Sequence, residues 1–301
     1  MVTSGRYTGS MALLRSVGHT LEMIKWEHSV FALPFALTAA VLAADGWPHP
    51  MQIVWIIVCM VTARSAAMAF NRWADSTLDA ANPRTSMRAI PAGTLSRNFV
   101  GGFVLVSALL FVLAASRLNM LTLLLSPVAL GVVLLYSYTK RFTRWSHVFL
   151  GVALGIAPAA AWIAIRGSLD PRILTLAAAV LFWVGGFDVF YSCQDAEHDR
   201  ASGLYSVPAT LGIPGAFWVA RIMHCVMLLL LVCMVQLFGL GLVGLAAVAL
   251  VAMLLLYEHS IISPRDLSRM NAAFFTLNGV ISIVFFVVIA SAVWVGRHHS
   301  A

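Results

Sequence analysis

Long apolar blocks recur along the whole chain, and they restrict its fold more than any other feature. Each block approaches the roughly 20 residues that a helix needs to cross a bilayer. The short stretches between them collect Pro, Gly, Asn and charged residues. We predict nine spans, near residues 28–44, 51–71, 98–116, 119–138, 146–165, 172–192, 214–237, 240–258 and 271–295. The sequence therefore predicts an all-α membrane protein with about nine transmembrane helices.

The composition agrees with a membrane solvent. Hydrophobic residues make up 61% of the 301 residues and charged residues 10%, whereas soluble domains carry about 25% charged residues. The blocks are also far longer than the ~10-residue alternating strands of a membrane barrel. We expect one membrane domain over residues 1–301, with two weakly repeated halves near 20–140 and 141–295.

Positive charge is distributed unequally between the two ends of the predicted spans. If the N-terminus is cytoplasmic, the cytoplasmic side carries Arg6, Arg15, Lys25, Arg72, Arg84, Arg88, Arg97, Lys140, Arg141, Arg144, Arg200, Arg265 and Arg269. The opposite side carries only Arg117, Arg166, Arg172 and Arg297. This bias predicts a multi-pass protein of the cell (inner) membrane with a cytoplasmic N-terminus. It also accounts for the net charge of +7 without a nucleic-acid partner.

Two ladders of polar residues interrupt the apolar pattern where the second and sixth spans end. Their members are Asn71, Asp75 and Asp79 in the first ladder and Tyr191, Asp195 and Asp199 in the second. A spacing of four residues places side chains on one face of a continuing helix. Each ladder is followed by a loop that contains a proline. The sequence therefore predicts two similar polar surfaces on the cytoplasmic side.

Carboxylates stacked in this way repel one another, and divalent cations would relieve the repulsion. Mg²⁺ prefers a few carboxylates together with water and the phosphate oxygens of a substrate. We therefore predict that the metal ligands are Asp75, Asp79, Asp195 and Asp199. Two solvated helix ends are the alternative, but a repeated spacing on one membrane side disfavours it. Of the nearby cations, Arg88 and Lys140 are predicted to bind a polyanion, whereas topology explains Arg97, Arg141 and Arg144.

These motifs resemble the UbiA superfamily of intramembrane prenyltransferases over nearly the whole chain. Residues 71–79 and 83–93 resemble the first aspartate motif and its trailing loop, 195–199 the second motif, and 136–140 the YxxxK element. The resemblance implies helices around a central cavity, with Mg²⁺ and a polyprenyl diphosphate held by the acids. It also implies a tunnel, open to membrane lipid, for the isoprenoid chain. The expected reaction transfers a polyprenyl group to an aromatic carboxylate in menaquinone or ubiquinone biosynthesis.

The resemblance and the positions of the residues together suggest individual roles. The predicted cofactor-binding residues, around the metal and diphosphate, are Asn71, Arg88, Tyr136 and Lys140. The predicted catalytic residues are Asp188, Tyr191 and Arg64. An unpaired charge inside a span is costly, so Arg64 is expected to bind the carboxylate or phosphate of the acceptor. Asp188 is expected to orient or deprotonate the acceptor, with helix packing as the alternative.

Some positions depart from the pattern of 4-hydroxybenzoate prenyltransferases. Arg72 stands where many members have Asp, and Tyr205 where a basic residue often precedes Ser. The opening of the first span, residues 25–34, and Glu197 resemble the branch that prenylates a naphthoate in the futalosine route to menaquinone. We therefore expect a preference for the naphthoate.

Two other functions remain open at this stage. Within the enzyme class, the acceptor could be haem, a chlorin or a lipid glycerol. A secondary transporter is the alternative outside that class, because internal repeats and intramembrane acids also mark transporters. Transporter sites tend to lie at the midplane, whereas these acids gather at one end of their spans. The placement favours the enzyme.

Overall fold

A computed structural model of the chain describes residues 18–24, 32–270 and 276–299. Its named elements are all helical: α2 (Leu33–Ala44), α3 (Pro50–Ala74), α4 (Ser76–Ala81), α5 (Arg97–Ser116), α6 (Met120–Leu135), η2 (Tyr136–Arg141), α7 (Ser146–Arg166), α8 (Ile173–Ser192), η3 (Cys193–Asp195), α9 (Ala196–Ala201), α10 (Val207–Leu237), α11 (Gly241–Ile261) and α13 (Asn278–His299). The predicted all-α class is confirmed.

Eight helices in the described part of the chain are long and apolar enough to cross a membrane. The first predicted span, 28–44, corresponds to α2, which has 12 residues and is shorter than the other eight. The preceding residues, including Lys25, Glu27 and His28, lie outside the described part. The molecule is therefore an integral, multi-pass membrane protein.

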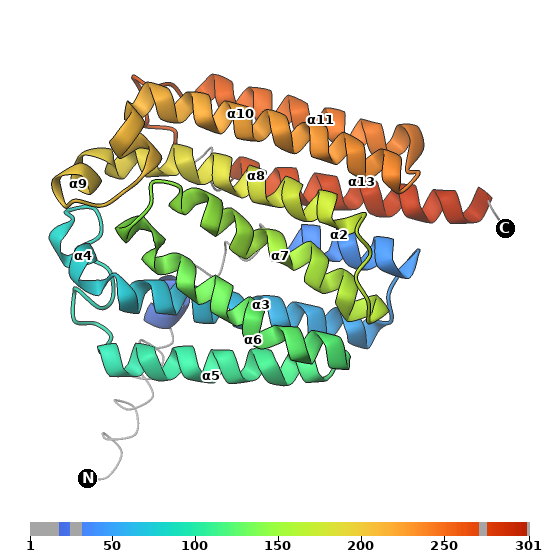
Figure 1. Cartoon of the computed structure of the whole chain (residues 1–301), viewed down its shortest axis with the longest axis horizontal. Coiled ribbons are helices and arrows are strands. Elements are labelled where there is room, and N and C mark those ends of the chain that lie inside the picture. The colour runs from blue at the N-terminus through green and yellow to red at the C-terminus, as the bar shows by residue number, and fades with distance from the viewer. Residues whose placement is uncertain (1–17, 25–31, 271–275, 300–301) are drawn as a thin grey trace, which may run out of the picture.

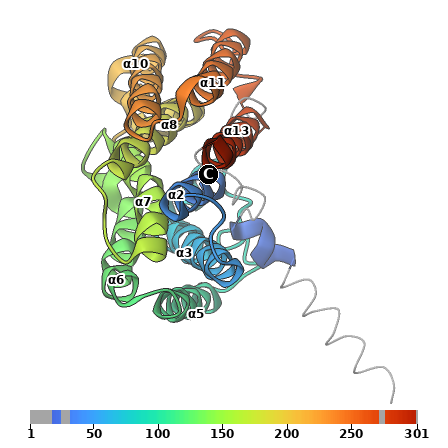
Figure 2. The same ribbon diagram turned by 90° about the vertical axis from the view of Figure 1, so that its right-hand side faces the viewer.

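The long helices form a ring when seen along their axes (Figure 2). Each helix packs against the next in the order α2, α3, α5, α6, α7, α8, α10, α11 and α13, and α13 returns to α2. α2 also packs against α7, across the ring. The short helices α4 and α9 lie together at one end of the bundle (Figure 1, left). Two segments far apart in sequence, each following a long helix, thus meet at that end.

Local signals define the ends of several helices. His49 and Gln52 form a capping box at the start of α3, with Pro50 at its first turn. Ser206 caps α10 by accepting a hydrogen bond from the amide of Ala209. Such side chains satisfy amide groups that the first turn of a helix leaves free. Of these two caps, only the Ser206 cap lies next to the polar end of the bundle, because His49 begins α3 at the opposite end.

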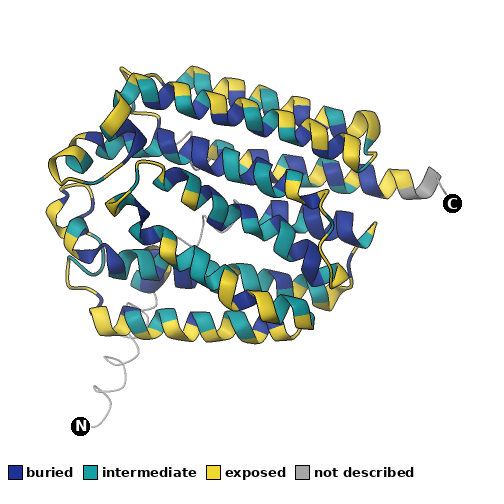
Figure 3. Cartoon of the chain, in the orientation of Figure 1, coloured by how far each residue is buried: buried dark blue, intermediate teal, exposed yellow. Residues whose placement is uncertain are grey.

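The outside of the ring is apolar, as a surface in contact with lipid requires. On α5 and α6, the exposed side chains include Leu105, Leu109, Leu124 and Val128. Figure 3 shows this alternation of exposed and buried positions along the helices. A buried aromatic group, in which Trp183 packs against Phe35 and Phe187, lies on the inner side.

Small residues allow α7 and α8 to approach closely. A Cβ atom at Gly151 would lie 2.4 Å from the carbonyl oxygen of Leu181. We therefore expect Gly151→Ala to destabilise the protein by about 1–3 kcal/mol, since backbone atoms must move. Thermal unfolding in detergent measures the effect. Gly131→Ala is the matched control, because nothing lies within 4 Å of a Cβ there. An unchanged unfolding temperature for Gly151→Ala would contradict the close packing.

Candidate active site

A polar cavity of about 700 Å³ opens at the end of the bundle where α4 and α9 lie. Residues from α3, the loop after α4, η2, α7, α8 and α9 line it. Its polar lining includes Arg64, Asn71, Arg72, Arg84, Arg88, Tyr136, Lys140, His147, Asp188, Tyr191, Asp195 and Asp199. Nine of the eleven residues predicted from the sequence thus border one cavity. The other two, Asp75 and Asp79, are 2% and 5% exposed and pair with the lining residues Lys140 and Arg88.

The first ladder keeps its spacing although its helix is interrupted. α3 ends at Ala74 and α4 begins at Ser76, so the ladder is not on one continuous helix as predicted. The backbone bonds from the amide of Asp75 to Asn71 O and from the amide of Asp79 to Asp75 O preserve the four-residue register. The Asn71 amide donates to Asp75 Oδ2 at 3.2 Å. The three side chains therefore still follow one another.

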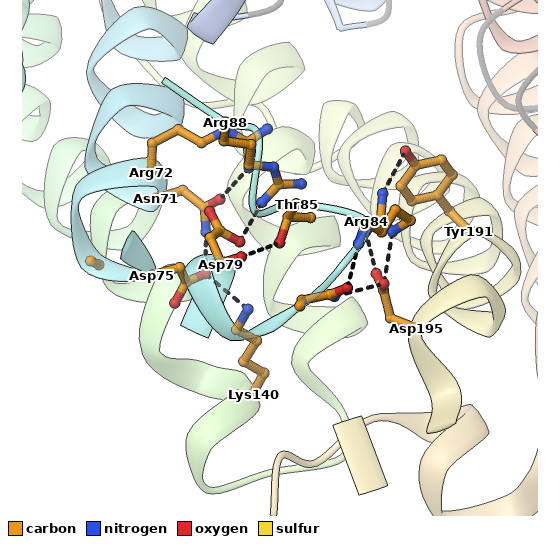
Figure 4. A network of polar contacts seen from close by, with 12 residues as sticks. Asn71, Arg72, Asp75, Asp79, Arg84, Thr85, Arg88, Lys140, Tyr191 and Asp195 are labelled. Atoms are coloured by element: carbon orange, nitrogen blue, oxygen red, sulfur yellow. Dashed lines mark hydrogen bonds and ion pairs between the residues drawn. The ribbon is translucent and has the colours of Figure 1, made fainter. Parts of the chain in front are cut away.

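Basic side chains compensate the charge of the first ladder (Figure 4). Lys140 Nζ lies 2.9 Å from Asp75 Oδ2, and Arg141 Nη2 lies 3.1 Å from Asp75 Oδ1. Arg88 Nη1 lies 2.6 Å from Asp79 Oδ1. These pairs explain how two buried carboxylates tolerate each other without solvent.

The second ladder is held by the loop that follows the first. Arg84 donates to both oxygens of Asp195, with Nε 2.7 Å from Oδ1, and Asn82 donates to the same Oδ1 at 3.1 Å. The guanidinium also lies 5.6 Å from the centre of the Tyr191 ring. Burial lowers the pKa of Arg84, but the hydrogen bonds and charge of Asp195 raise it above its ordinary value. A charged bridge therefore connects the two ladders.

Four residues of this network were not assigned site roles from the sequence. Asn82 and Arg84 reach the second ladder from the loop after the first, across more than a hundred residues. Arg141 pairs with Asp75, so topology alone does not explain it. His147 contacts Asp188. The sequence contains a signal for Arg84, which lies in the loop that resembles the family motif, and for Arg141, which directly follows Lys140.

The donor atoms around the cavity suit a hard cation. The four predicted acids present carboxylate oxygens in or beside this lining, and Asp79 Oδ2 is buried with no hydrogen-bond partner among the described residues. Within those residues, no group of three or more His, Cys, Asp and Glu forms a closed metal cage. Mg²⁺ is usually bound by one or two carboxylates together with substrate phosphates, so this open arrangement fits it.

A second, apolar cavity of about 370 Å³ lies between α3, α6 and α7. It shares Arg64, Met68, Tyr136, Leu150 and Leu154 with the polar cavity. Arg64 therefore lies at the boundary between them, and its buried Nε has no hydrogen-bond partner in the described part of the chain. The arrangement can hold an anion at its polar end and a long apolar chain at the other.

Comparison with known proteins agrees with this geometry. The UbiA prenyltransferase family model matches residues 32–294. A 4-hydroxybenzoate octaprenyltransferase of Nitrosomonas eutropha is 32% identical over 249 residues, which cover 81% of this chain and 85% of the relative. The apo structure of a UbiA homolog from Aeropyrum pernix K1 superposes with a TM-score of 0.79 at 31% identity, covering 90% of this chain and 98% of the homolog. A UbiA homolog from Archaeoglobus fulgidus bound to DMAPP and Mg²⁺ has the same fold, with a TM-score of 0.73 at 16% identity, covering 92% of this chain and 99% of that homolog. The chain belongs to the UbiA prenyltransferase family.

Proposed function

We propose that this protein transfers a polyprenyl group from an allylic diphosphate to an aromatic carboxylate, in a Mg²⁺-dependent step of quinone biosynthesis. The observation that carries the proposal is the pair of adjoining cavities, one polar and the other apolar. The second ladder borders the polar cavity, and the acids of the first ladder pair with cations that line it. The Archaeoglobus homolog with DMAPP and Mg²⁺ and the relatives named for 4-hydroxybenzoate support the same reaction.

The donor diphosphate belongs at the polar end of the paired cavities. Asp75, Asp79, Asp195 and Asp199 would hold Mg²⁺, which when bound stabilises negative charge on the departing diphosphate. Arg88 and Lys140 face the same cavity and add positive charge to it. The isoprenoid chain would extend into the apolar cavity, away from water.

The acceptor carboxylate belongs beside Arg64. A partly buried arginine whose buried Nε has no partner among the described residues gains most from a planar anion that accepts two hydrogen bonds. An aromatic ring held there would lie between the polar and apolar cavities. The relatives are named for 4-hydroxybenzoate, and the preference for a naphthoate, inferred from positions such as Arg72 and Tyr205, stays a prediction.

The distribution of Lys and Arg supports a cavity that faces the cytoplasm from the inner membrane.

The position of the ladders distinguishes the proposed enzyme from a transporter. A transporter site would be expected near the bilayer midplane on broken helices, whereas the ladders gather at one end of the bundle (Figure 1).

One assay tests the function. Purified protein in lipid nanodiscs is incubated with a prenyl diphosphate, Mg²⁺ and either 4-hydroxybenzoate or a dihydroxynaphthoate, and products are measured by mass. We expect a prenylated acid that depends on Mg²⁺ and is abolished by EDTA. No product from either acid would reject the proposed acceptor class. Product from 4-hydroxybenzoate alone would reject the naphthoate preference only.

The cations of the cavity yield a second prediction. We expect Lys140→Ala and Arg88→Ala each to raise the KM for the diphosphate donor about 10-fold, because each charge contributes on the order of 1–3 kcal/mol to anion binding. Initial rates at varied donor concentration measure it. Arg144→Ala is the control, since Arg144 lies over the Trp145 ring and is not among the residues lining the cavity. An equal donor KM in all three variants would indicate that Arg88 and Lys140 contribute to membrane topology and not to donor binding.

A further inference from the structure

His147 and Asp188 form a pair on the wall of the polar cavity. His147 lies in the first turn of α7 and Asp188 in the last part of α8, and Nδ1 of the histidine is 2.7 Å from Oδ2 of the carboxylate. Both residues line the cavity. The side chain of His147 is 4% exposed and that of Asp188 is 23% exposed. The aspartate is thus the member that a bound molecule can reach.

The other ring nitrogen of His147 fixes which nitrogen carries the proton. The backbone amide of Val207 donates to Nε2 at 3.4 Å. Val207 is the first residue of α10, where an amide group has no partner within the helix. Because an amide can only donate, Nε2 must offer its lone pair. The proton therefore sits on Nδ1, which donates it to Asp188.

This hydrogen bond holds one oxygen of Asp188, Oδ2, in place. Oδ1 accepts no hydrogen bond from the described residues, and it belongs to a side chain that borders the cavity. Arg64, Tyr136 and Asp188 all line this cavity. A cation and a carboxylate therefore border the same space.

We propose that His147 is a positioning residue: by donating to Oδ2, it holds Asp188, already expected to orient or deprotonate the acceptor, so that Oδ1 faces the acceptor's ring hydroxyl. The inference rests on the proposed function and adds a second contact between protein and acceptor, besides the one expected from Arg64. An aromatic acid that also carries a hydroxyl beside the alkylated carbon would be bound at both ends. Arg64 would hold the carboxylate, and Asp188 the hydroxyl.

Atoms and charge balance in the prenyl transfer itself. The ring carbon next to the hydroxyl bonds to C1 of the prenyl group while the C1–O bond breaks, and its electron pair leaves with the diphosphate. The hydroxyl proton passes to Asp188 Oδ1, which gives a neutral dienone. The ring hydrogen then leaves as a proton to water, and Asp188 returns its proton to the oxygen. The aromatic ring and the ionised carboxylate are both restored.

Two substitutions at His147 separate positioning from packing. Asn places an amide near the position of Nδ1 and can still donate to Asp188. Gln places its amide near Nε2 and can serve only the amide of Val207. We expect His147→Gln to lower kcat/KM for the acceptor about 10-fold or more and His147→Asn to stay within about 3-fold of the wild type. The donor KM changes less than 2-fold in both.

Asp188→Asn and a more acidic acceptor complete the test. We expect Asp188→Asn to lower acceptor kcat/KM about 100-fold, the range of a lost general base. Relative to the wild type, both Asp188→Asn and His147→Gln should lose less activity with a ring-fluorinated 4-hydroxybenzoate, because its hydroxyl gives up its proton more easily.

The outcomes are distinct. Equal activity of His147→Gln and His147→Asn, or losses that do not depend on hydroxyl acidity, would overturn the positioning role. If His147→Gln does not accumulate in membranes, Asp188→Asn decides alone by the same acidity comparison. A wild type that prenylates none of these acids contradicts the proposed function instead, before any variant is compared.

Discussion

Asp79→Asn is expected to lower kcat for prenyl transfer about 1000-fold, since it removes one charge from the four acids proposed to hold Mg²⁺ for the diphosphate. Asp79 is 5% exposed, and one of its two oxygens pairs with Arg88. The other oxygen, Oδ2, is buried without a hydrogen-bond partner in the described structure. Asparagine keeps the shape of the side chain but removes the anionic oxygen that a metal would bind.

Thermal unfolding gives a readout independent of turnover. A ligand that binds only the folded protein raises its stability, so Mg²⁺ with a non-hydrolysable diphosphate should raise the unfolding temperature of the wild type but not of Asp79→Asn. Asp170→Asn is the matched control, because Asp170 pairs with Arg172 on the exposed surface. Normal kcat together with a normal shift in Asp79→Asn would remove Asp79 from the metal site.

The other three acids test the metal less cleanly. We expect alanine at Asp75, Asp195 or Asp199 to abolish Mg²⁺-dependent turnover as well. Asp195, however, also holds Arg84 and Asn82, so its loss disturbs the contact between the two halves of the site. Asp75 similarly holds Lys140 and Arg141. Near-normal activity in any two of the four acid variants would reject the metal assignment.

Local patterns in the sequence predicted much of this structure. Span length and apolar composition identified the helices, because a bilayer imposes both. The four-residue spacing of Asn71, Asp75 and Asp79 survived the interruption at Asp75, since the backbone bonds continue through it. Arg64 was predicted to be a functional residue because an unpaired charge inside an apolar span is costly.

Contacts between distant segments could not be predicted in the same way. The bond from Arg84 to Asp195 depends on how α4 and α9 meet, and spacing along one helix contains no information about that meeting. The pair of His147 and Asp188 arises because α7 and α8 pack side by side. The sequence suggested that the carboxylates repel one another, whereas the folded chain pairs most of them with cations.

Arg64→Leu is expected to insert and fold normally yet lose acceptor use about 150-fold, which corresponds to about 3 kcal/mol for a buried charge pair that has lost one member. Without substrate, the Nε of Arg64 is buried and unpartnered within the described residues. Leucine relieves the cost of burying that charge, so the unfolding temperature should be equal or higher. The donor KM and the response to Mg²⁺ should not change, because the aspartate ladders remain intact.

An acceptor that lacks the carboxylate gives the decisive comparison for Arg64. The wild type and Arg64→Leu should use a simple phenol equally poorly, since the arginine then has nothing to bind. Arg64→Lys should lie between wild type and Leu with 4-hydroxybenzoate or a naphthoate, because lysine keeps the charge but not the two parallel hydrogen bonds of a guanidinium. A loss of activity with phenol as large as the loss with the acid would indicate that Arg64 supports the fold and does not bind the carboxylate. An equal loss of donor binding would move it to the diphosphate site.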